Sequence, residues 1–170
     1  MDSTIPLVQL EELFEHDMVS QQRSEATKTH YRYTFKDFHQ FLRETKRSET
    51  AASLNAECIR DFSVWLANTP TRAWRGKTKR EVQSVHGRLR DLRAFTRWLE
   101  QDGKIDRAPI IKLPTLPQVQ FPILTDDQVQ RLLNCEHLTA PGPQAVRNRA
   151  LIGLMLDTGI RRSEAAVIEF

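Results

Sequence analysis

Apolar residues that recur every three or four positions are the feature that most limits what this chain can fold into. The clearest stripe lies in the stretch from about 78 to 101 and contains Val82, Val85, Leu89, Leu92, Thr96 and Leu99. A helix turns once every 3.6 residues, so this spacing puts the stripe on one helical face. Alternation of apolar and polar residues, which is typical of half-buried strands, is almost absent. The sequence therefore predicts an all-α fold arranged as a helical bundle.

Three further helices are predicted upstream, each from its own apolar spacing. The first is short and amphipathic, with the apolar residues Leu7, Leu10, Leu13 and Phe14. The second is long and begins with Ser24 as its N-cap. Its buried stripe is predicted to contain Tyr31, Phe35, Phe38 and Leu42. The third lies within residues 56–67, and its apolar side consists of Ile59, Phe62, Trp65 and Leu66.

Glycine and proline divide the rest of the chain. Gly103 is expected just past the end of the long helix, and four prolines between 109 and 122 predict an extended, semi-rigid linker. Thr125 and Gln128 then fit a capping box at the start of another helix, and Gly159 is expected to stop a later one. A last helix is expected to open near Arg161. We therefore expect an extension (1–22), a helical domain (23–105), a linker (106–122) and a second module (123–170).

Positive charge is concentrated in the middle of the chain. The net charge is only +3, yet residues 71–107 carry eleven Lys or Arg against five Asp or Glu. A second stripe on the long helix contains Lys79, Gln83, His86, Arg90, Arg93 and Arg97. Such a stripe suits a phosphate backbone, although a solvated helix face is the alternative. Solvated faces usually alternate in sign, whereas residues 71–97 hold only Glu81 and Asp91 as acids, which favours an interface with a polyanion.

Several classes of protein are not indicated. No apolar run approaches the roughly 20 residues that cross a bilayer, and the amino terminus lacks the order of a signal peptide, so we expect no membrane partner and a cytoplasmic, nucleoid-associated setting. Cys58 and Cys135 are far apart and have no metal-ligand spacing. No metal, cofactor or disulfide is therefore expected.

One segment near the carboxyl end resembles a known motif. Residues 157–164, DTGIRRSE, resemble the T-G-[LI]-R-x-S-E motif of the tyrosine recombinases, the phage-integrase family. Residues 147–151 resemble its R-[DN]-x-A-L run, and Leu124, Thr125 and Val129 resemble its L-T-x-x-x-[VI] opening. Upstream, the aromatic stripe and Leu89, Arg93, Phe95, Trp98 and Gly103 resemble its SAM-like core-binding domain. The resemblance implies that residues 123–170 are the truncated start of a catalytic domain.

The resemblance also implies roles for individual residues. Arg161 matches the arginine that contacts the scissile phosphate, where a guanidinium can donate two hydrogen bonds to the oxygens that gain charge. Glu164 is expected to orient this loop or to pair with an arginine. Double-stranded DNA is the implied partner. The residues expected to bind it are Lys28, Arg32, Lys77, Lys79, Arg80, His86, Arg90, Arg93 and Arg97.

The chain departs from the family in its catalytic set. Its only tyrosines are Tyr31 and Tyr33, and no histidine is followed by arginine three positions later. We therefore expect a DNA-binding protein of the recombinase and integrase family that is inactive alone. Two alternatives stay open. One is a partner-dependent or inhibitory subunit of a full-length recombinase, and the other is a protein-interaction remnant of a mobile element whose exposed carboxy-terminal helices bind another protein.

Overall fold

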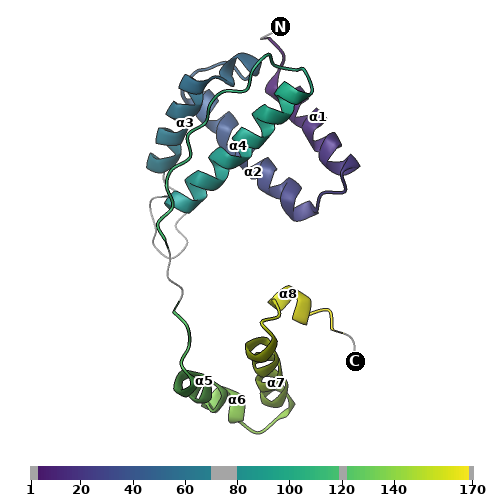
Figure 1. Ribbon diagram of the computed structural model, residues 1–170, viewed down its shortest axis with the longest axis vertical. Helices are drawn as coiled ribbons and strands as arrows, with labels where there is room; N and C mark the ends of the chain where they lie inside the picture. Colours follow the sequence, from purple (N-terminus) through teal and green to yellow (C-terminus); the bar gives the residue numbers. More distant parts are fainter. Residues whose placement is uncertain (1–3, 70–79, 119–121, 169–170) are drawn as a thin grey trace. The chain divides into compact units, whose positions relative to one another are not determined.

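The computed structural model describes residues 4–69, 80–118 and 122–168, and it confirms the all-α fold (Figure 1). Within those ranges no strand is present, and the one isolated β-bridge joins Pro6 to Thr50. The chain divides into two units, Met1–Pro117 and Gln118–Phe170. Each unit is described by itself below.

The first unit is a bundle, and two of its helices begin with a side-chain cap, of which the sequence predicts the one at Ser24. Ser24 Oγ accepts the Thr27 N–H at 3.2 Å, and Asn55 Oδ1 accepts the Cys58 N–H at 2.9 Å. Each bond satisfies one of the N–H groups that the first turn of a helix leaves unpaired. The elements are α1 (Leu7–Ser20), α2 (Glu25–Glu44), the 3-10 turn η1 (Ala51–Ser53), α3 (Ala56–Asn68) and α4 (Val82–Gln101).

Two groups of aromatic rings fill the core of this unit. In the first group, the Phe35 and Phe95 ring centroids lie 4.9 Å apart and join α2 to α4. In the second, the Phe38 and Phe62 centroids lie 5.0 Å apart and join α2 to α3. Edge-to-face ring pairs of this kind add about 0.5–1.5 kcal/mol beyond the area they bury. The aromatic stripe predicted for α2 is therefore the centre of the bundle.

Helix α1 belongs to this core, which the sequence-based boundary at residue 22 did not anticipate. Leu7 and Leu10 are almost fully buried, and the Phe14 ring lies 5.3 Å from Phe95 and 5.1 Å from Trp98. The prediction that Leu13 shares this apolar face is wrong, since its exposed fraction is 47%. The helix packs on α2 and α4, so residues 7–20 are not an extension outside the bundle.

The apolar stripe predicted on α4 is largely confirmed. Its members from Val85 to Leu99 are buried, whereas Val82 is 47% exposed and is not part of the core. Val82 is the first residue of α4, and Thr78, the predicted helix start, lies outside the described residues. Gly103 takes a left-handed backbone conformation (φ 68°) just after the helix, as expected for a residue in that place.

Residues 104–117 pack against the bundle, although the sequence predicts an extended linker from 106. After α4 this segment turns back and runs alongside α3 and α4 (Figure 1). Ile111 is 7% exposed within the core cluster, and Ile105 and Leu113 pack against that cluster. Prolines prevent a helix here, but the apolar side chains between them still gain from burial. We call residues 104–117 the strap.

One histidine ties three parts of the first unit together. His39 on α2 is 8% exposed, and its Nε2 lies 2.9 Å from a Glu11 carboxylate oxygen on α1. Its Nδ1 bonds Glu49, which lies just before η1 and is also 3.6 Å from Arg43. The hydrogen bond to Glu11, followed by the charges of both carboxylates, raises the pKa of His39 above its usual 6.5 even though burial opposes the charged form.

This arrangement predicts a pH-dependent contribution to stability. A raised pKa means that the folded chain binds the proton more tightly, so the contribution is complete below about pH 6.5 and is lost as pH rises through the folded value. Urea unfolding of the wild type and of His39→Gln at pH 6 and pH 8 measures it. We expect the difference in unfolding free energy between the two proteins to be larger at pH 6. An equal difference at both pH values would show that the imidazole does not act as a cation here.

The second unit has clear helix signals but a small core. Thr125 and Gln128 form the predicted capping box, with bonds of 3.3 and 2.9 Å. Gly159 ends α7 in a left-handed conformation (φ 67°), as predicted. Among the described residues of this unit, only Leu138 and Ala145 are buried. The elements are α5 (Asp126–Leu133), α6 (Glu136–Thr139), α7 (Pro143–Thr158) and α8 (Arg162–Ala165).

Within the described ranges, no helix combines the length and the apolar character needed to cross a membrane. The same ranges contain no group of three or more His, Cys, Asp or Glu side chains placed to hold a metal ion.

Candidate nucleic-acid interface

The face of α4 that points away from the core carries the predicted basic stripe. Arg90 and Arg97 are exposed there, and His86 and Arg93 are half-buried. Asp91, one of the two acids counted in this part of the sequence, is 2% exposed and turns inward, where its Oδ2 accepts a hydrogen bond from Thr34 Oγ1 at 2.7 Å. The outer face is therefore more positive than the sequence count indicates.

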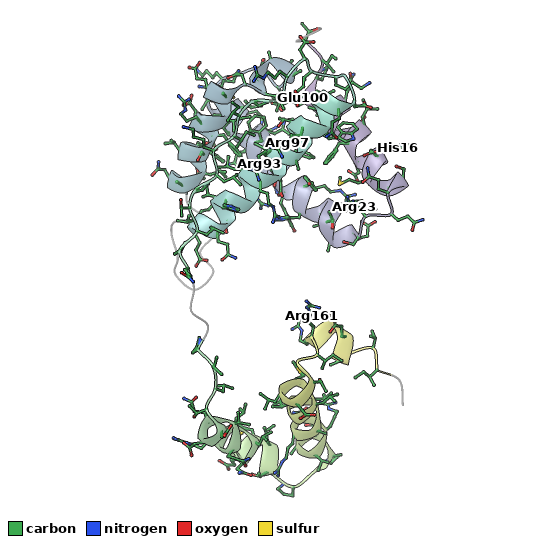
Figure 2. The ribbon with its side chains drawn as sticks, in the orientation of Figure 1. His16, Arg23, Arg93, Arg97, Glu100 and Arg161 are labelled. Atoms are coloured by element: carbon green, nitrogen blue, oxygen red, sulfur yellow. The ribbon has the colours of Figure 1, made fainter. Side chains whose placement is uncertain are left out.

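Arg93 and Arg97 lie one turn apart on this face (Figure 2). Neither forms an ion pair with the described part of the chain, so their guanidinium groups keep their donors available for a ligand. Arg90 differs slightly, because its Nη2 lies 3.5 Å from Asp91 while its side chain stays 56% exposed. Four cationic or titratable groups thus line up along about 16 Å of helix.

Beside this face, a groove of about 440 Å³ runs between α2 and α4. Most of its polar lining residues can donate hydrogen bonds, which suits an anion. Gly87 adds no side chain to the groove. The lining residues are His30, Arg80, Gln83, Ser84, His86, Gly87, Arg88, Arg90 and Leu116.

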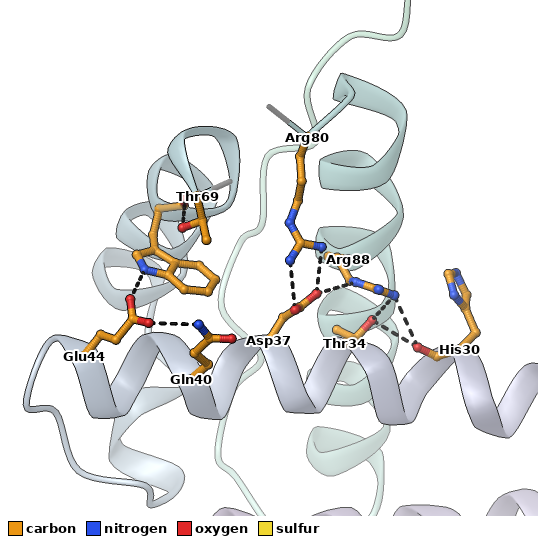
Figure 3. Close-up of polar contacts among 9 residues, drawn as sticks. His30, Thr34, Asp37, Gln40, Glu44, Thr69, Arg80 and Arg88 are labelled. Atoms are coloured by element: carbon orange, nitrogen blue, oxygen red, sulfur yellow. Dashed lines mark hydrogen bonds and ion pairs between the residues drawn. The ribbon is translucent and has the colours of Figure 1, made fainter. Parts of the chain in front are cut away.

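Three of the groove's neighbours form one ion cluster, which Figure 3 shows in close-up. Arg80 donates to both carboxylate oxygens of Asp37 at 2.9 Å, and Arg88 Nε donates to Asp37 Oδ2 at 2.8 Å. Arg88 also lies over the Tyr33 ring, 5.8 Å from its centroid. The Nε of Arg80 is buried and has no hydrogen-bond acceptor within the described ranges. Two guanidinium groups share a single carboxylate, which leaves one net positive charge at the groove.

Two other predicted DNA-binding residues are already paired with carboxylates. Lys28 pairs with Glu25 on its own helix, and Arg32 pairs with Glu15 on α1. Because these cations already have carboxylate partners, they are weaker candidates than the α4 arginines. Lys77 and Lys79 lie outside the described residues.

The second unit presents Arg161 at the start of α8 (Figure 2). The Arg161 side chain is 81% exposed, and its Nη1 donates to Glu164 Oε1 at 3.0 Å. The Arg161 backbone N–H also donates to Glu164 Oε2 at 2.9 Å. These two bonds, the backbone one first, lower the pKa of the Glu164 carboxyl. These contacts agree with the pairing expected between Glu164 and an arginine, and the role of Glu164 in orienting the loop stays a prediction.

Sequence reasoning missed Arg88 and His30. Arg88 sits next to the apolar stripe of α4 on the helical wheel, and only the packing of α4 on α2 brings it to Asp37. His30 lies on α2, 3.5 Å from Asp91 and at the edge of the groove. No local pattern indicates either position, because both partners are distant in sequence.

Much of this chain is similar in sequence to known tyrosine recombinases. The chain is 28% identical over 153 residues to tyrosine recombinase XerC of Oceanobacillus iheyensis, which is 88% of this chain and 46% of that protein. It is 30% identical over 131 residues to tyrosine recombinase XerD of Listeria innocua, which is 76% of this chain and 41% of that protein. The chain belongs to the tyrosine recombinase family. The predicted membership of this family is therefore confirmed.

A third tyrosine recombinase, XerC 2 of Ralstonia nicotianae, is 34% identical over 86 residues, which is 49% of this chain and 24% of that protein. The chain spans less than half the length of these tyrosine recombinases. No family model matches it. No solved structure gives a significant match either.

Proposed function

We propose that this tyrosine recombinase chain binds double-stranded DNA through the outer face of α4. The proposed location of this binding is the cytoplasm. The observation that carries the proposal is the row formed by His86, Arg90, Arg93 and Arg97, in which Arg93 and Arg97 have no carboxylate partner in the described part of the chain. A cation without an internal partner gains most from a phosphate, because it gives up no existing ion pair on binding.

The residues proposed for the DNA-binding unit span α1 to the strap, and Arg93 and Arg97 are its main phosphate contacts. Contacts of this type fix the position of a protein on a duplex without reading its sequence. Their spacing of one helical turn, about 6 Å, is close to the separation of neighbouring phosphates along a strand. The proposal therefore concerns binding to the backbone, and any sequence preference comes from other side chains.

Arg161 supplies the second part of the proposal, a contact to a phosphate at the start of α8. Its exposed guanidinium and the ionised Glu164 beside it suit that role. Strand cleavage is not proposed for Tyr31 or Tyr33. Burial raises the pKa of Tyr31, whose ring packs 5.0 Å from Phe14, and Tyr33 lies under Arg88. The partly buried phenol of Tyr31 is held protonated and is therefore a poor nucleophile, whereas Tyr33 is 55% exposed and lies beneath a guanidinium group.

Binding to a labelled 20-base-pair duplex across a salt series tests this function. Each neutralised phosphate contributes a slope of about −0.9 to the plot of log K against log salt concentration, so three or four contacts predict a slope of about −3 to −4. The same series with Arg161→Ala is expected to lower the slope by about one contact. A folded protein that binds no duplex at low salt would exclude the proposed function.

A further inference from the structure

We infer that the groove between α2 and α4 is a phosphate site, and that Asp37 positions Arg80 and Arg88 to hold the phosphate. The inference rests on the proposed function, because the phosphate it assigns is one of the duplex backbone. It adds a site beside the outer face of α4, and it gives a role to a carboxylate, which by its charge alone would repel DNA.

The geometry of the cluster supports a positioning role for Asp37. One carboxylate accepts three hydrogen bonds of 2.8 to 2.9 Å from two arginines, and these hold both planar groups in a fixed relation. Arg88 is fixed further by contacts of 3.4 and 3.5 Å from Nη1 to Thr34 Oγ1 and the His30 carbonyl. Long side chains lose entropy when a ligand immobilises them, so arginines already held in place bind an anion at a lower cost.

The unused donors of the cluster point to a missing acceptor. An arginine carries five N–H groups, and Arg80 directs two of them to Asp37. Its Nε is buried without an acceptor in the described part of the chain, which is rare because an unsatisfied buried donor costs about 1–3 kcal/mol. This Nε is closed to the groove, so the donors that a phosphate there can reach are the remaining N–H groups of Arg80 and Arg88, whose side chains are 14% and 16% exposed.

The rest of the groove has the composition that a phosphate requires. Ser84 and Gln83 add neutral donors, and His30, His86 and Arg90 add groups that are cationic or become so on protonation. The one carboxylate that the cluster contains, Asp37, is only 14% exposed and faces its two arginines. The anion would therefore meet N–H and O–H groups.

Asp37→Asn separates this inference from simple electrostatics. Losing a negative charge should tighten DNA binding if Asp37 acts only through its charge. The amide can accept a hydrogen bond from one arginine but turns its NH₂ toward the other, so we expect duplex affinity to fall by about 5- to 10-fold if Asp37 positions the pair. Glu12→Gln, an exposed position on α1, removes the same charge and serves as the matched control, with affinity unchanged or slightly higher.

Arg80→Lys provides a second variant in case Asp37→Asn does not fold. Lysine keeps the charge but replaces the planar fork with a single ammonium group, so we again expect a loss of about 5- to 10-fold in duplex affinity. Affinity that is unchanged in this folded variant, or tighter in folded Asp37→Asn, would overturn the inference. In both cases the salt-dependent binding of the wild type would still stand, so the proposed function would survive.

Arginine Nε–H resonances distinguish the source of the phosphate. In ¹H–¹⁵N spectra of the wild type, we expect a short duplex to shift the Arg80 and Arg88 Nε–H signals at concentrations where it binds. Inorganic phosphate is expected to produce the same shifts only at much higher concentration. Shifts with inorganic phosphate and none with duplex would assign the groove to a free phosphate and overturn the backbone assignment. No shift with either would overturn the site itself.

Discussion

Reversing the charge of Arg93 and Arg97 together is expected to weaken duplex binding by about 100-fold at about 0.1 M salt. Each phosphate contact contributes about −0.9 to the slope of log K against log salt concentration, which corresponds to nearly a factor of ten in affinity at about 0.1 M salt. A glutamate in place of each arginine also repels the phosphates. Both side chains lie on the outer face of α4, away from the core, so folding should not change. Fluorescence anisotropy with a labelled duplex measures the loss, and circular dichroism checks the fold.

The matched control moves the same charge change to another part of the first unit. Lys46 follows α2 and Arg60 is an exposed residue on α3, so Lys46→Glu with Arg60→Glu alters the net charge by the same amount. We expect this control to weaken binding by less than about fivefold, through the long-range field alone. Equal losses in the two double variants would mean that net charge decides the binding, and the α4 face would lose its special role.

Truncating Phe14 to alanine is expected to lower the unfolding free energy of the first unit by about 3–5 kcal/mol. The ring is 6% exposed and contacts Tyr31, Phe35, Phe95 and Trp98, with centroid distances from 5.0 to 6.4 Å. Its removal leaves a cavity at the point where α1 meets α2 and α4, and a neighbouring ring can fill only part of it. Urea unfolding followed by circular dichroism measures the change.

Leu13→Ala is the matched control, since it removes an apolar side chain from the adjacent position on the same helix. Leu13 is 47% exposed, so we expect a cost below about 1 kcal/mol. If Phe14→Ala cost no more than Leu13→Ala, α1 would be a dispensable extension, as the sequence alone suggested. A large difference would show that the helix is needed for the bundle.

The sequence predicts the local features well because their causes are local. Ser24, Thr125 and Gly159 act within one helical turn, so the cap at each helix end is visible in a few neighbouring residues. The basic and apolar faces of α4 follow from a single period. Neither signal depends on which other helix packs nearby.

The features that the sequence does not predict depend on contacts between distant segments. Asp37 meets Arg80 and Arg88 across 43 and 51 positions, and no local pattern links them. The charge of Arg80 alone predicts a DNA contact, but its pairing with Asp37 changes which of its N–H groups are available. The prolines of the strap predict a linker because proline excludes a helix, but burial of Ile111 depends on a groove that exists only after α3 and α4 pack.

Because α1 packs on a helix that is synthesised later, part of its apolar face stays uncovered during translation. Leu7 and Ala51 anchor the start of this helix through backbone hydrogen bonds near η1, but Phe14 is covered by Phe95 and Trp98. Phe95 is synthesised about 80 residues after Phe14, which takes roughly 4 to 16 s at about 5–20 residues per second. During that interval the apolar face of α1 has no native cover from α4. Helix α1 is thus synthesised well before the helix that covers Phe14, and until then its apolar face is open to chaperones or to wrong partners.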